Sequence, residues 1–177
     1  MLSILPFILV ISATQPVQPV VIDTAEFTIE MTPRTPDQMR SFYEARGFPV
    51  EMLDEISRYC FITTGITNKG KDKLWLDLSQ WEYSSGGKII ERRHRSQWKA
   101  HWQKTGMPKS SQATFRWTLM PETLDYLPGE REGGNVTLPF TPGHFTLEAS
   151  FRTGDDKKGK VIKIRTDKLF CAEDPVQ

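Results

Sequence analysis

Strict alternation of apolar and polar side chains is the feature that most constrains the fold of this chain. It appears at both ends of the stretch from 113 to 151, where the apolar positions are Phe115, Trp117 and Leu119 and then Phe145, Leu147, Ala149 and Phe151. A period of two places one row of side chains on a buried face and the other row in water, as in a half-buried β-strand. We therefore expect strands at 113–119 and 144–152, and we expect them to supply the core.

Other segments carry the same pattern or are bounded by turn residues. The further strands that we expect lie at 25–31, 60–64, 74–83, 136–140 and 161–171. The polar loop around Gly70 favours a β-hairpin between the second and third of these, and the charged loop 154–159 favours another. This pattern predicts a mainly β (α+β) fold, an antiparallel β-sandwich, with one strongly curved sheet as the alternative.

Two segments interrupt the strands with helical signals. In the first, Thr35 and Pro36 suit the start of a helix. The apolar spacing that follows predicts an N-terminal helical hairpin over 35–59. In the second, two tryptophans one helical turn apart predict one further short helix over 95–105.

The chain begins with an apolar run, residues 2–11, followed by small residues and a proline-containing stretch. This order is typical of a secretory signal peptide, although no Lys or Arg precedes the run. A helix of about 11 residues rises only about 16 Å, too little for a hydrocarbon core of about 30 Å, so we expect no transmembrane span. We predict a signal peptide at 1–13, an extended segment at 14–24 and a single β-rich domain at 25–177 in a periplasmic or secreted protein. A hydrophobic N-terminal strand or an uncleaved anchor is the alternative.

The chain has two cysteines, Cys60 and Cys171, far apart in the sequence. In an exported protein an even number of cysteines favours a disulfide. Closing a loop of this length stabilises the fold by about 4–5 kcal/mol in the chain-entropy model. Two buried thiols or a two-thiolate metal site are the alternatives.

A segment from 88 to 107 is both basic and aromatic, with six Lys or Arg residues against one Glu. Tryptophan and arginine are enriched at the energetic centres of interfaces, and clustered positive charge attracts anionic partners. We therefore predict a surface that binds a protein or another anionic partner of the cell envelope, formed by Arg92, Arg93, Arg95, Trp98, Lys99 and Trp102. The alternative is a solvated helix face whose tryptophans belong to the core. Intramolecular pairing with the acidic residues between 122 and 148 would also use this charge.

The same segment contains a possible metal site. His94 and His101 are seven residues apart, which places them on one face of a helix, and Met107 follows. Imidazole and thioether ligands suit copper(I), although the basic surroundings disfavour a cation. Copper handling by His94, His101 and Met107 is therefore an alternative function; otherwise we expect no cofactor.

Signatures of catalysis are absent from the sequence: it has no nucleophile elbow, phosphate-binding loop, zinc-protease motif or dinucleotide fingerprint. An acidic run over 122–132 could hold a hydrolytic carboxylate pair, but a solvated loop is the simpler interpretation. A net charge of +1 gives no reason to expect nucleic acid as a partner. The sequence thus favours an exported, non-enzymatic binding or accessory protein, with copper handling and hydrolysis as alternatives.

Overall fold

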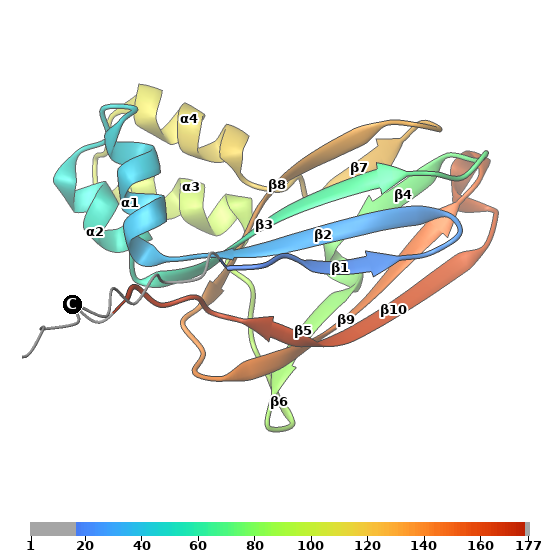
Figure 1. Ribbon diagram of the computed structural model, residues 1–177. Coiled ribbons are helices and arrows are strands. Elements are labelled where there is room, and N and C mark those ends of the chain that lie inside the picture. Colours follow the sequence, from blue (N-terminus) through green and yellow to red (C-terminus); the bar gives the residue numbers. More distant parts are fainter. Residues whose placement is uncertain (1–16, 176–177) are drawn as a thin grey trace, which may run out of the picture.

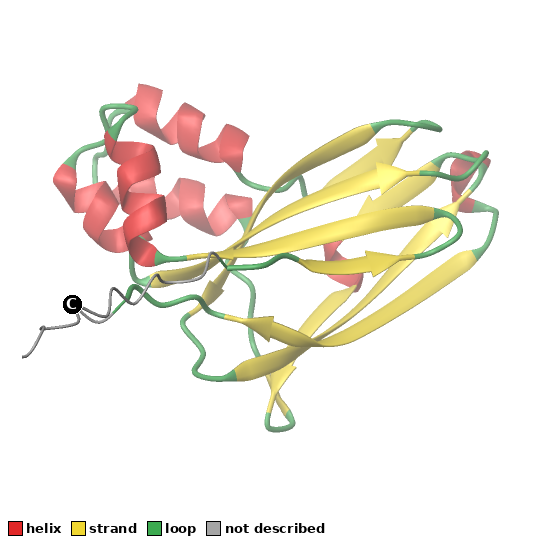
Figure 2. Ribbon diagram, in the orientation of Figure 1, coloured by secondary structure: helices red, strands yellow, loops and turns green. Residues whose placement is uncertain are grey.

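Two antiparallel sheets form the body of the protein in a computed structural model that describes residues 17–175 (Figure 1, Figure 2). The first sheet has the strand order β1-β2-β3-β8. Its strands are β1 (Val20–Asp23), β2 (Phe27–Arg34), β3 (Tyr59–Asn68) and β8 (Arg131–Pro139). We call it sheet A. The predicted mainly β fold with antiparallel sheets is confirmed.

The second sheet, sheet B, is organised around β9, which pairs with strands along both of its edges. One edge is lined by β4 and β5, and the other by β10. The strands are β4 (Leu74–Asp77), β5 (Trp81–Ser85), β6 (Lys88–Ile89), β7 (Thr123–Tyr126), β9 (His144–Thr153) and β10 (Val161–Phe170). β9 and β10 form the antiparallel pair that the charged loop between them predicted.

The alternating residues of β9 point inward as expected: Phe145, Leu147, Ala149 and Phe151 are all buried. They meet the apolar row of β2 across the space between the sheets, and the rings of Phe27 and Phe151 lie 4.4 Å apart. Burying one such side chain stabilises the fold by about 1.5–3 kcal/mol. This contact between the sheets makes the fold a sandwich.

The predicted strand at 113–119 is wrong, because these residues belong to helix α4 (Lys109–Thr118) and the residue that follows it. Ser111, Phe115 and Leu119 recur every four residues and are buried, whereas Trp117 is 80% exposed. Apolar residues at i, i+2 and i+4 all fit the period of a strand, and the first and last of them also fit the period of a helix. A run this short therefore does not distinguish a strand from a helix. Helix α3 (Arg95–Lys104) is the predicted short helix, so the prediction of one such helix missed α4.

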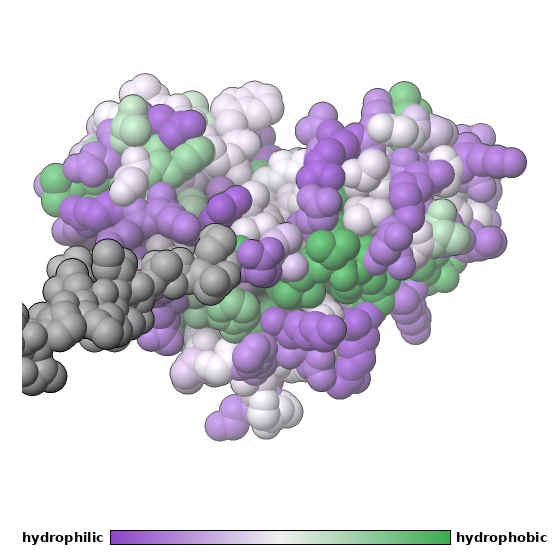
Figure 3. Space-filling model, viewed as in Figure 1, coloured by the Kyte–Doolittle hydropathy of each residue, from purple (hydrophilic) through white to green (hydrophobic). Residues whose placement is uncertain are grey.

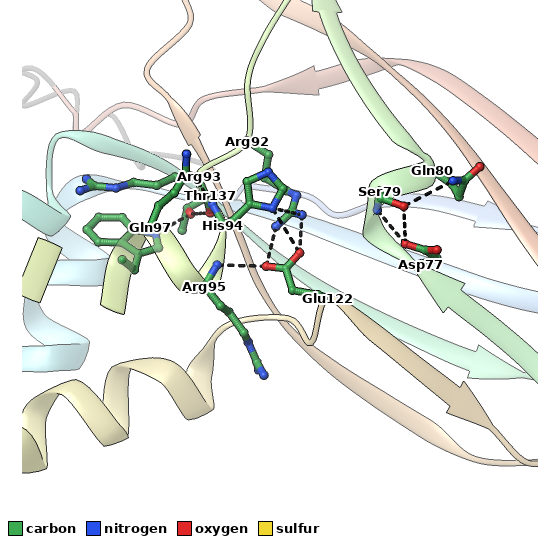
Figure 4. A network of polar contacts seen from close by, with 11 residues as sticks. Asp77, Ser79, Gln80, Arg92, Arg93, His94, Arg95, Gln97, Glu122 and Thr137 are labelled. Carbon is green, nitrogen blue, oxygen red and sulfur yellow. Dashed lines mark hydrogen bonds and ion pairs between the residues drawn. The ribbon is translucent and has the colours of Figure 1, made fainter. Parts of the chain in front are cut away.

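The predicted hairpin between 60–64 and 74–83 is also wrong, because β3 lies in sheet A and β4 in sheet B. Asn68, which is 1% exposed, fixes this crossing. Its side-chain amide donates to the carbonyls of Asp72 and Tyr126, at 2.9 and 3.0 Å. The expected single strand 74–83 is two strands separated by a turn, in which Asp77 accepts a hydrogen bond from the backbone of Ser79 at 3.0 Å (Figure 4).

Helices α1 (Pro36–Glu44) and α2 (Val50–Ile56) form the expected N-terminal hairpin. Thr35 caps α1, and its backbone amide donates to the side chain of Gln38 at 3.2 Å. Within residues 17–175, the α-helices α1 to α4 gather at one end of the sandwich (Figure 1), where they form a second core with Phe61 of β3. The buried residues of this helical core are Met39, Tyr43, Phe48, Met52, Leu53, Ile56, Phe61, Trp98, Trp102, Phe115 and Leu119.

The predicted disulfide is confirmed: Cys60 at the start of β3 is bonded to Cys171, the residue after β10. The bond therefore joins sheet A to the end of sheet B. An apolar band crosses the visible face where the edge strands β1 and β10 meet, with Val21 and Val161 about half exposed (Figure 3). Within residues 17–175, no helix is long and apolar enough to cross a membrane. The predicted signal peptide at 1–13 lies outside the described residues.

Candidate functional site: the cleft between α3 and α4

A threonine of β8 connects sheet A to the start of helix α3. The backbone amide of Arg93 donates to the carbonyl of Thr137 at 2.9 Å, and the Thr137 hydroxyl donates back to the carbonyl of Arg93 at 3.1 Å. The same hydroxyl accepts the indole N–H of Trp98 at 2.8 Å. At the start of the helix, the backbone amide of His94 donates to the Gln97 side chain at 2.7 Å (Figure 4). The first turn of α3 is therefore held rigidly against the sheet.

Arg92 and Arg93, two of the six residues predicted to bind a partner, form ion pairs within the protein. Arg92 has an 8% exposed side chain and forms an ion pair with Glu122, with Nη1 3.2 Å from Oε1 (Figure 4). Arg93 lies over the ring of Trp98, 3.9 Å from its centroid, and Nη1 lies 3.0 Å from Oε1 of Glu55. Both charges are thus neutralised by carboxylates. The pair of Arg92 and Glu122 is of the kind that the intramolecular alternative expected, whereas Glu55, the partner of Arg93, lies outside the acidic residues between 122 and 148.

Glu122 also receives the backbone N–H of Arg95 at 3.0 Å, at the start of α3. Burial by itself raises the pKa of this carboxyl, but the hydrogen bonds from Arg92 and from Arg95 outweigh burial. The pKa of Glu122 therefore lies below its ordinary value, and the group is ionised at neutral pH. Glu122, the residue before β7, thereby connects this strand to the helical end of the protein.

The other four predicted residues line one cavity of about 150 Å³ between α3 and α4. Its lining residues are Arg95, Trp98, Lys99 and Trp102 from α3, with Gln112, Ala113, Phe115, Arg116 and Leu119 from α4 and the residue that follows it. We call this site the α3–α4 cleft. Sequence reasoning missed the α4 residues because 113–119 was assigned to a strand. The four-residue spacing of Ser111, Phe115 and Leu119 was the signal that could have found them.

Stacked aromatic rings form the inner wall of the α3–α4 cleft. Trp98 and Trp102 stack with their centroids 5.1 Å apart, and Phe115 meets both rings at steep angles, at 4.9 and 5.6 Å. The two tryptophans are only 1% and 2% exposed, so most of each ring belongs to the helical core. The two tryptophans therefore form the back of the cleft, and the charged residues line its mouth.

The mouth of the α3–α4 cleft is positively charged. Arg95, Lys99 and Arg116 line it, and none of the described residues that line it is acidic. Burial, and next the charge of Arg116, lower the pKa of Arg95, and Glu122 offsets only part of this effect. Two donors also lack an acceptor among the described residues, Nε of Arg95 and the indole nitrogen of Trp102. The uncompensated positive charge at the mouth suits a group that is anionic or accepts hydrogen bonds.

The predicted metal ligands lie beside separate carboxylates. Nδ1 of His94 lies 3.4 Å from Oε2 of Glu122, and Nε2 of His101 lies 3.6 Å from Oε1 of Glu55. Met107 packs against the helical core. Within residues 17–175, no three His, Cys, Asp or Glu side chains gather as metal ligands would. The copper site stays a prediction.

Acidic residues between 122 and 132 hold the ends of β7 in place. Glu122 pairs with Arg92, Asp125 lies 3.0 Å from the ammonium of Lys73, and Glu130 accepts the backbone N–H of Leu127 at 2.7 Å. These contacts give each of the three carboxylates a structural partner. Hydrolysis by this run stays a prediction.

Comparison with known proteins identifies no family for this chain. No protein-family model matches it, and no curated protein matches it. Among solved structures it is similar to the yjhA protein from Bacillus subtilis, with a TM-score of 0.43 and 8% sequence identity, over 76% of this chain and 80% of that one. A likeness at this level carries no inference about function, which must come from the site itself.

Proposed function

We propose that this protein is an exported, non-enzymatic binding or accessory protein that docks an anionic partner through the α3–α4 cleft. One observation carries the proposal: three cationic side chains surround an aromatic cavity whose described lining residues include no acidic group. The charges of Arg92 and Arg93 are balanced within the fold. Those of Lys99 and Arg116 are not, because neither side chain has an ion-pair partner among residues 17–175.

Partner size and chemistry follow from the shape of the cleft. A cavity of about 150 Å³ holds roughly one large side chain, not a drug-sized ligand, which needs about 300 Å³ or more. A protein partner would insert one apolar side chain against Trp102 and Phe115 and place acidic residues on either side of it. Arginine and tryptophan are the residues that most often dominate the binding energy of such interfaces. The charged rim would accelerate the encounter and make it sensitive to salt.

The bond between Cys60 and Cys171 supports the export part of the proposal. Disulfides persist in oxidising compartments such as the periplasm and the extracellular space, and they are rare in the cytosol. Fusing residues 1–20 to alkaline phosphatase, which is active only after export, tests this part separately. A fusion that stays inactive and unprocessed would contradict export.

The docking surface is tested by charge reversal. The variant carries Lys99→Glu and Arg116→Glu, two exposed positions at the mouth of the cleft. The matched control carries Lys163→Glu and Lys168→Glu, two exposed lysines of β10 on sheet B, with a similar change in net charge. The probe is a fluorescein-labelled peptide in which a phenylalanine is flanked by runs of glutamate.

We expect the reversal at the cleft to weaken binding of the peptide at least about 10-fold, and the control to change it by less than about 2-fold. The affinity of the unmodified protein should fall as the salt concentration rises. Equal loss in the two variants would show that net charge, and not the cleft, attracts the peptide. Unchanged affinity in the cleft variant would overturn the assignment of the surface.

A further inference from the structure

A second and larger hollow, of about 570 Å³, lies on the other side of α4. Residues of β2, β3 and β8 in sheet A form its floor, and residues of α1 and α4 form its walls. Figure 1 shows how these elements are arranged. The two sides of α4 therefore face different sites: Phe115 lines the α3–α4 cleft, and Trp117 lines the hollow. None of the residues discussed for the cleft lines this hollow, so it is a separate site. We call it the α1–α4 groove.

A chain of hydrogen bonds runs along the floor of the α1–α4 groove. Nε of Arg34 donates to the hydroxyl of Thr63 at 3.0 Å, and that hydroxyl donates to Oδ1 of Asn135 at 2.8 Å. On the α4 side of the groove, the phenol oxygen of Tyr43 lies 2.6 Å from the hydroxyl of Thr118. Thr118 donates its own proton to a carbonyl of its helix at 2.7 Å, so Tyr43 is the donor to Thr118.

Both donors in the chain from Arg34 through Thr63 to Asn135 point away from Arg34. Hydrogen bonds arranged in one direction polarise one another and hold their members in one geometry. The guanidinium of Arg34 is therefore fixed from one side, through Nε. Its two terminal nitrogens have no acceptor among the described residues. They remain available to a ligand in the groove.

The charge of the groove specifies the ligand. Arg34 is the one charged side chain among the described residues that line it. One positive charge balances a monoanion, whereas a phosphate or sulfate dianion would remain half compensated. A guanidinium with two free terminal nitrogens matches the two oxygens of a carboxylate. A carboxylate is thus the anion that fits.

An apolar wall stands beside Arg34. Met39 and Phe42 of α1 form one part of it, and Trp117 of α4 forms the other. Trp117 is 80% exposed and Phe42 is 36% exposed, whereas the tryptophans of α3 are buried. An exposed tryptophan in a concave site is the kind of residue that anchors a partner. The group bearing the carboxylate should therefore also carry an apolar side chain.

The groove continues beyond Arg34 over the outer face of sheet A. A further hollow of about 450 Å³ shares the Arg34 and Thr63 end and extends to the ion pair of Glu30 and Arg131, which lie 2.6 Å apart. Gly65 lies in the middle of this face and carries no side chain, so that only the end of the Arg131 side chain lies over it. A longer chain that displaces this flexible end could enter over the sheet and end at Arg34.

We propose that the α1–α4 groove binds the C-terminal end of a polypeptide, with the terminal carboxylate on Arg34 and an apolar last side chain against Trp117 and Phe42. A small free acid would leave most of Trp117 and the continuing groove uncovered. A neutral glycan could stack on Trp117 but would leave the charge of Arg34 without a counter-ion. A peptide terminus uses the single charge, the apolar wall and the path over the sheet together.

The test uses fluorescein-labelled peptides of about eight residues that end in Leu, Phe or Ala, each with a free or an amidated C-terminus. We expect the peptides ending in free Leu or Phe to bind, and amidation to weaken them about 10- to 100-fold, because a hydrogen-bonded charge pair is lost. The variants Arg34→Gln and Trp117→Ala should each weaken binding at least about 10-fold. The glutamine introduced by Arg34→Gln retains a donor for Thr63, and Trp117 is exposed, so the folds should persist.

Matched controls are Arg165→Gln and Phe140→Ala, which remove an exposed arginine and an exposed phenylalanine outside the groove. They should bind the peptides as the unmodified protein does, and so should the charge-reversal variant of the α3–α4 cleft. The proposal is overturned if amidated peptides bind equally well, if neither groove variant loses affinity, or if no peptide binds. It is also overturned if phenylpropionate or an oligogalacturonate binds more tightly than every peptide.

Discussion

The guanidinium of Arg92 and the carboxylate of Glu122 form an ion pair that fastens the segment before α3 to the segment before β7. Replacing Glu122 by Gln leaves the buried guanidinium of Arg92 without its counter-charge. Removing one partner of a fully buried pair costs about 3–5 kcal/mol, and Glu122 is 38% exposed, so we expect a loss of about 1–3 kcal/mol in the free energy of unfolding. Urea denaturation measures it.

The Glu122→Gln variant should also change how stability depends on pH. Because the pKa of Glu122 is lowered in the folded protein, its contribution is present above the ordinary pKa and is lost as the pH falls through the folded value. The unmodified protein should therefore lose more stability than the variant between neutral pH and the acid range. The control Glu148→Gln, in a largely exposed pair with Arg165, should cost less than about 1 kcal/mol. Parallel pH profiles for the protein and the Glu122 variant would contradict this role.

Thr137 is the residue through which β8 holds α3. Its replacement by Val removes the acceptor of the Trp98 indole and the donor to the carbonyl of Arg93. We expect a loss of about 1–3 kcal/mol, because buried polar groups lose their partners. Combining it with Trp98→Phe in a double-mutant cycle should give a coupling of at least about 0.5 kcal/mol. Thr146→Val on β9 is the control. If the losses of stability caused by Thr137→Val and Trp98→Phe simply add, this would argue against a direct hydrogen bond between the two residues.

Reduction of the Cys60–Cys171 bond should destabilise the protein markedly. The bond closes a loop with a sequence separation of 111 residues. In the chain-entropy model this corresponds to about 4–5 kcal/mol, which is a large share of the stability of a typical domain. The midpoint of urea unfolding with and without reductant measures the change. A protein carrying Ser at both positions should not respond to reductant, and alkylation of the unreduced protein would show that the bond does not form.

Gly133 and Gly65 face each other across β8 and β3 and give a matched pair of substitutions. A Cβ at position 133 would lie 2.3 Å from the carbonyl oxygen of Thr64, which is fixed in the sheet. At position 65 it would meet only the end of the Arg131 side chain, which can move away. We expect Gly133→Ala to cost about 1–3 kcal/mol and Gly65→Ala clearly less. Equal losses of stability in the two variants, measured by thermal unfolding, would contradict the close approach of position 133 to the carbonyl oxygen of Thr64.

Local patterns in the sequence predicted those elements whose periodicity has one interpretation. β9 alternates over its full length, and the α1–α2 hairpin has a cap and helical spacing, so both were found. The run from Phe115 to Leu119 was assigned to a strand because it is too short to separate the two periods. The separation of β3 and β4 into different sheets could not be predicted, because the amide of Asn68 reaches a carbonyl of β7 that is distant in the sequence.

The composition of the sequence identified about half of the residues that line the α3–α4 cleft and none of those that line the α1–α4 groove. The density of basic and aromatic residues identified Arg95, Trp98, Lys99 and Trp102, which lie on one helix. Their partners on α4 became visible only once that helix was known. Arg34 and Trp117 come from β2 and α4, and no local pattern connects them. A groove assembled from separate elements depends on tertiary packing, which short-range sequence patterns do not encode.

The position of the Cys60–Cys171 bond divides the chain topologically. Nearly all of the chain from β3 to β10 lies inside one covalent ring, whereas β1, β2, α1 and α2 lie on the tail that precedes it. A protease that cuts an exposed loop of the ring, such as the one between β9 and β10, leaves a single covalent molecule. A cut between α2 and β3 leaves the tail without a covalent connection to the ring, and with it Arg34 and the α1 wall of the groove.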